Sequence, residues 1–187
     1  MLPAMRRIGI LALAAVLVAG GALAAAGLLT RNNAAAPAKS VWTETAWPFP
    51  TDPWGKGKAF RCRAEHCGEE VSLYIRAKIG FCGCVAAIDD DDVDRVGDLD
   101  LLGKERAALG AGRPIEVRWI KGRSRPYALG DAAKARSALS IALHERCDMI
   151  VATAVLTGDQ PTVQEPAVVE FLNSDVVLRW AEVALGL

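Results

Sequence analysis

Three patterns in the sequence predict an α+β fold, in which helices cover a small antiparallel sheet and a C-terminal helix closes the chain. Apolar and polar residues alternate strictly from Glu70 to Gly80, which is typical of a strand with one buried face and one wet face. The segment Met149–Leu156 is short and rich in β-branched residues, as strands often are. Finally, Pro166–Leu185 repeats its apolar residues at helical spacing.

The N-terminal segment predicts export. Ile8–Leu29 carries no charged side chain, and about 22 residues rising ~1.5 Å each could cross a hydrocarbon core of roughly 30 Å. Arg6 and Arg7 precede this run, so the positive-inside rule sends the rest of the chain out of the cytoplasm. Small residues around Ala22 also fit a signal-peptidase site. Residues 1–29 are therefore predicted to be a membrane anchor or a cleaved signal segment, and we favour the anchor because the apolar run continues past that site.

The remaining chain divides into a tether, an arm and one domain. Residues 30–40 are small and polar with one proline, the composition of a flexible tether. Residues 59–187 are predicted to form a single extracytoplasmic α+β domain, periplasmic in a bacterium. Without Arg6 and Arg7, the 22 basic residues become 20, against 22 acidic residues. This balance does not indicate a nucleic-acid partner, so the predicted partners are the membrane and a possible second protein.

Residues 41–58 form an arm rich in tryptophan and proline. Its prolines lack amide donors and exclude a regular helix or a central strand. Two interpretations stay open. The aromatic side chains could pack on the domain or lie in the membrane interface, or the arm could dock a protein partner. The candidate interaction residues are Trp42, Trp47, Phe49 and Trp54.

Within the domain, alternating residues predict strands over 59–63, 115–119 and 124–129. Residues 89–102 begin with a run of aspartates and precede Gly103, which predicts a helix with acids at its N-terminal end. The glycines of 104–113 predict a loop.

Residues 137–157 fit either a capped helix followed by a strand or two strands that meet around His144, and we favour two strands. In the closing helix, the predicted apolar stripe consists of Val169, Leu172, Val176, Trp180 and Val183.

Five cysteines are the most informative chemical feature of an exported domain. Thiols in an oxidising compartment usually end as disulfides. We expect Cys62 and Cys67 to pair with Cys82 and Cys84, because this pairing would join two neighbouring strands. Cys147 is then left as a partly buried small apolar residue. These four paired cysteines are the disulfide candidates.

The same region supports a competing interpretation as a metal or redox site. Thiolates and an imidazole suit zinc or copper, and the candidate ligands are Cys62, His66, Cys67, Cys82 and Cys84. A thiol-redox role has less support, because the usual C-x-x-C spacing is missing. No cofactor other than zinc or copper is indicated.

No catalytic motif is found in the sequence, and the only histidines are His66 and His144. The acidic run of 89–100 fails the EF-hand register and fits a solvated helix start better. Basic residues of 118–136 could bind an anion, but a wet strand face explains them as well. The sequence therefore predicts a disulfide-stabilised, membrane-anchored binding or interaction module, and leaves its ligand open.

Overall fold

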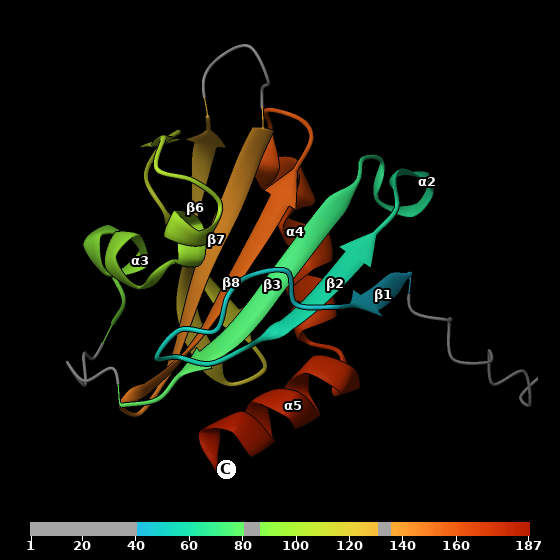
Figure 1. Cartoon of the computed structure of the whole chain (residues 1–187). Helices are drawn as coiled ribbons and strands as arrows, with labels where there is room; N and C mark the ends of the chain where they lie inside the picture. The colour runs from blue at the N-terminus through green and yellow to red at the C-terminus, as the bar shows by residue number, and fades with distance from the viewer. Residues whose placement is uncertain (1–40, 81–86, 131–135) are drawn as a thin grey trace, which may run out of the picture. The chain divides into compact units, whose positions relative to one another are not determined.

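An antiparallel sheet of eight strands organises the part of the chain that the computed structural model describes, residues 41–80, 87–130 and 136–187. The strand order is β1-β2-β3-β8-β7-β6-β4, with β5 paired to β6. Helices cover this sheet, so the predicted α+β class is confirmed (Figure 1). The predicted membrane or signal segment lies outside these residues. Within them, no helix has the length and apolar character needed to cross a bilayer.

The strands are β1 (Trp42–Thr45), β2 (Lys58–Cys62), β3 (Val71–Lys78), β4 (Arg106–Ala108), β5 (Arg113–Val117), β6 (Ile120–Leu129), β7 (Arg136–Glu145) and β8 (Asp148–Leu156). The helices are α2 (Ala64–Cys67), α3 (Asp90–Val96), α4 (Pro161–Leu172) and α5 (Asp175–Leu185), with a 3-10 helix η2 (Asp98–Leu101) after α3. The two strands predicted on either side of His144 are thus confirmed as β7 and β8.

Both faces of the central strands are covered, so most residues of β7 and β8 are buried whichever way their side chains point. On one face, α4 and α5 pack over the larger core cluster, which includes Leu73, Leu139 and Ile141. On the other face, two smaller clusters form beneath α3 and η2. In Figure 1 the arm crosses the same face as α3, whereas α4 lies behind the sheet. All three clusters lie within the compact unit Ser40–Leu187.

The predicted helix over 89–102 is divided at Gly97. Asp89 caps α3, because its carboxylate accepts a hydrogen bond from the Asp92 amide at 2.8 Å. Gly97 then has an extended ψ of 146°, and η2 follows. A Cβ on Gly97 would lie 2.7 Å from Ser140 Oγ, so only glycine lets the chain pass this close to β7. The helix start was predicted correctly, whereas its end at Gly103 was wrong.

The predicted closing helix over 166–185 is two helices. α4 begins at Pro161, and Asn173 and Ser174 separate it from α5. Ser174 adopts an extended backbone (ψ 151°), which ends the helical path. This break changes which side of the chain faces the core. Leu172 is buried, and Val169 and Trp180 pack against the core as predicted, but Val176 and Val183 are exposed, so the single stripe across both helices is wrong at these two valines.

The arm contributes an edge strand and an aromatic cover. β1 pairs with β2, and Trp42 is buried where it stacks on Phe171 with ring centroids 4.8 Å apart. Further along, Trp47 and Phe49 meet Tyr74 of β3 edge-on, at 6.0 and 4.8 Å. The aromatic side chains of the arm therefore pack on the sheet, which is the first of the two interpretations left open by the sequence.

The polar face of β3 is the clearest departure from the predicted pattern. Alternation predicted a wet face there, but Arg76 and Lys78 are only 3% and 5% exposed. The arm and η2 supply the covering segments, since Asp52 and Asp98 both bond to Arg76. The strand was predicted correctly, and its solvent-exposed face was wrong.

Candidate functional site

Cys62 and Cys67 are joined to each other. Their Sγ atoms are 1.98 Å apart and their Cα atoms 6.1 Å apart, closing a loop that contains the short helix α2. The expected cross-pairing with Cys82 and Cys84 is therefore wrong for these two residues, and both expected partners lie outside the described residues. Cys62, at the end of β2, is fully buried in the main core, so this bridge fastens the α2 turn to the sheet.

Cys147 also belongs to a disulfide. It lies in the turn between β7 and β8, at the end of the sheet where β3 finishes at Lys78. The prediction that Cys147 remains a thiol is thus wrong. All three cysteines that the structure describes are oxidised.

The candidate metal ligands are not assembled in the described part of the chain. His66 is 49% exposed on α2, and its Nε2 lies 3.7 Å from the Glu65 carboxylate. Cys62 and Cys67 are held in their bridge and offer no thiolate in this state. Among residues 41–80, 87–130 and 136–187, no group of three or more histidine, cysteine or acidic side chains is placed to hold a metal ion.

A buried ion network lies beneath the arm. Arg76 donates to both carboxylate oxygens of Asp98, at 2.6 and 2.5 Å, and to Asp52 at 2.7 Å. Lys78 Nζ lies 2.9 Å from the same Asp98 carboxylate and donates to the Val96 carbonyl at 2.6 Å. The two cations and two carboxylates balance in charge, so the network fastens the arm and η2 to β3.

The network shifts the pKa of two members. Burial alone would lower the pKa of Arg76, but its hydrogen bonds to Asp98 and Asp52 outweigh burial and raise it. The hydrogen bond from Arg76 lowers the pKa of Asp52 below its ordinary value of 3.8. Both groups stay charged at neutral pH, which suits a structural clamp better than proton transfer.

We expect acid to loosen this clamp. Because the folded-state pKa of Asp52 is lowered, its contribution to stability is present above the ordinary value of 3.8 and is lost as pH falls through the lower value. Asp52→Asn should reduce the free energy of unfolding by about 1–2 kcal/mol at pH 7. The difference from wild type should begin to shrink below pH 3.8 and approach zero as pH falls through the lower folded-state pKa, where the folded wild-type carboxyl becomes protonated. Urea unfolding followed by circular dichroism across this range measures it, and a difference independent of pH would contradict the prediction.

The basic residues of β6 are largely matched by the acids of α3. Arg123 bonds to Asp90, and Arg125 Nη1 donates to Asp94 at 2.8 Å. Tyr127 donates to the same Asp94 carboxylate, and burial together with this bond raises the pKa of its phenol. The acidic run and the central basic residues thus neutralise each other across one face of the sheet, which removes most of the predicted anion site.

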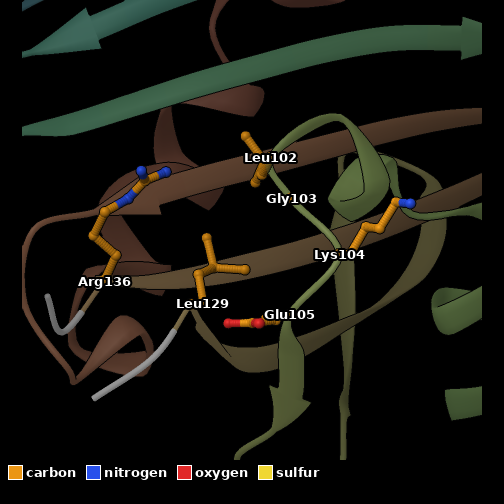
Figure 2. Close-up of a pocket in the computed structure, with 7 residues that line it drawn as sticks. Leu102, Gly103, Lys104, Glu105, Leu129 and Arg136 are labelled. Atoms are coloured by element: carbon orange, nitrogen blue, oxygen red, sulfur yellow. The ribbon is translucent and has the colours of Figure 1, made fainter. Parts of the chain in front are cut away.

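Two further hollows in the described part of the chain are candidate ligand sites because charged side chains line them. The first has a volume of about 390 Å³. Arg136 and Lys104 lie on opposite sides of its Leu129 (Figure 2), so these cations do not converge on one ligand. The second, of about 480 Å³, is lined by His144 and Lys121, which are cross-strand neighbours. Neither hollow assembles a recognisable catalytic group.

An exposed apolar surface, which does not contribute to the core, lies along α5. Val177, Leu178 and Ala181 face the core. The opposite side of α5 carries an exposed stripe of Val176 and Val183, which are 57% and 84% exposed.

Half-buried Trp180 lies between these two valines on the helix. Beside the stripe is a groove of about 270 Å³, whose other wall is Glu44 of β1 with Lys58 and Phe60 of β2. We call the stripe and this hollow together the α5 groove.

The sequence contained these residues but gave the wrong orientation. Val176, Trp180 and Val183 were predicted to face the core, but the structure exposes Val176 and Val183, whereas Trp180 is half-buried and packs against the core. The orientation of α5 depends on where the helix breaks, and the helical spacing of apolar residues does not predict that position. Comparison with protein-family models and with curated proteins finds no match to this sequence.

Proposed function

We propose that this chain is an exported, membrane-tethered module that acts by binding, and that the α5 groove is its binding surface. The exposed apolar stripe carries the proposal, because valines that are 57% and 84% exposed serve no purpose in the core of this domain. The neighbouring concave hollow supplies the shape that recognition requires. Trp42 and Trp47 of the arm are engaged in packing, so the binding surface differs from the arm itself.

Oxidised cysteines support the extracytoplasmic placement. Cys62, Cys67 and Cys147 are all disulfide-bonded, and stable disulfides are rare in a reducing cytosol. The apolar run of 8–29 with its preceding arginines supports the tether. A folded domain of this kind, held by a short linker, is suited to presenting a surface close to a membrane.

A thiol inventory tests the placement. We expect Cys62, Cys67 and Cys147 to resist alkylation in the protein isolated from its native compartment, and to become reactive after reduction. Peptide mapping by mass spectrometry measures the extent of alkylation at each cysteine separately. A C-terminal alkaline phosphatase fusion, which is active only outside the cytoplasm, gives an independent measurement. An inactive fusion together with thiols that react at once would contradict export.

The same preparation tests the alternative function as a zinc or copper protein or a thiol-redox protein. Metal analysis after mild isolation should find no stoichiometric zinc or copper if the cysteines serve as structural bridges. Stoichiometric metal bound to reduced Cys62 and Cys67 would support the alternative and contradict a binding module built on disulfides.

A further inference from the structure

We propose that the α5 groove binds the lipid interface of the membrane to which the chain is tethered. This inference rests on the proposed tether and names the partner of the same surface. Its chemistry is that of an interfacial helix, with apolar side chains on one side and a tryptophan among them. The stripe of α5 meets this description through Val176, Trp180 and Val183.

An exposed tryptophan lies in a turn whose neighbouring residue contacts the start of the same helix. Trp119, 55% exposed, is in the hairpin turn between β5 and β6. The preceding residue, Arg118, lies 3.8 Å from Asp175 in the first turn of α5 and donates its amide to Asn173. Tryptophans with a nearby basic residue are typical of protein surfaces at the headgroup level of a bilayer.

The end of the tether favours lipid over other occupants. Residues 30–40 can span at most ~40 Å when fully extended. They join the domain at Val41, and Glu44, which lines the groove, lies only about 10 Å further along β1. A tethered domain therefore meets the bilayer at high effective concentration, so a small apolar patch is sufficient for contact. A separate soluble protein gains no such advantage.

Fluorescence quenching by lipid tests the inference with the full-length chain. The protein is reconstituted in phosphatidylcholine vesicles with plain or brominated acyl chains, and the emission of Trp180 is obtained as the difference between wild type and Trp180→Phe. We expect brominated lipid to reduce this emission at least roughly twofold. The double variant Val176→Lys/Val183→Lys should abolish the reduction. Val163→Lys is the matched control, because Val163 is 63% exposed but lies on α4, and it should quench like wild type.

The outcomes separate the inference from the proposed function. Full-length protein that stays in the membrane fraction while Trp180 is not quenched would overturn the lipid contact and leave the tether standing. Trp180 that becomes protected only as protein concentration rises would identify a second copy as the occupant, and would also overturn the inference. Full-length protein that is absent from the membrane fraction would overturn the tether itself, together with the contact that rests on it.

Discussion

Replacing Asp98 with asparagine is expected to lower the free energy of unfolding by about 3–5 kcal/mol. Asparagine preserves the size of the side chain but removes its charge. Arg76, whose side chain is 4% exposed, would keep its ion pair with Asp52, whereas Lys78, 7% exposed, would lose its ion pair with Asp98 and keep its hydrogen bond to the Val96 carbonyl. Two buried cations facing one half-exposed anion are costly, because protein packing excludes the water that would otherwise solvate them.

Asp100 is the matched control for this experiment. It lies two residues away in the same 3-10 helix, and its carboxylate pairs with Arg106, but its side chain is 80% exposed. Asp100→Asn should therefore cost less than about 1 kcal/mol. Urea unfolding at pH 7 compares both variants with wild type. Equal and small losses in the two variants would show that the Asp98 cluster is well hydrated and does not clamp the arm.

The buried network also shows where prediction from the sequence had to stop. Alternation alone identified β3, because a half-buried strand needs only a period of two. It could not show that Arg76 would be covered, since its partners Asp98 and Asp52 lie 22 and 24 residues away along the chain. Tertiary partners of this kind decide whether a polar strand face is wet or buried, and they leave no local pattern.

The α5 groove was missed for a different reason. Helical spacing was recognised through Val176, Trp180 and Val183, but a period of 3.6 residues does not reveal which side of a helix meets the core. The extended backbone of Ser174 resets that orientation between α4 and α5. The cysteine pairing was missed because the sequence alone does not determine connectivity, and Cys62 found its partner only five residues away.

Truncating Phe171 to alanine is the second large effect that we expect, at about 3–5 kcal/mol of unfolding free energy. Phe171 is 6% exposed near the end of α4. Its ring stacks on Trp42 at 4.8 Å and meets Phe60 edge-on at 4.9 Å, so one side chain joins α4 to β1 and β2. Its removal leaves a cavity beneath β1 that the rigid sheet cannot close.

The location of the damage distinguishes this variant from a general loss of stability. Because Trp42 stacks on the Phe171 ring, amide hydrogen exchange should accelerate first in β1 and the start of the arm, while the central strands β7 and β8 keep their protection. Val163→Ala on the same helix is the control, since Val163 is 63% exposed and should change stability by less than about 0.5 kcal/mol. Uniform acceleration across the sheet would show that the edge does not depend on this contact. Selective loosening of β1 would establish that the point where the tether enters the domain is held by the aromatic contact with α4.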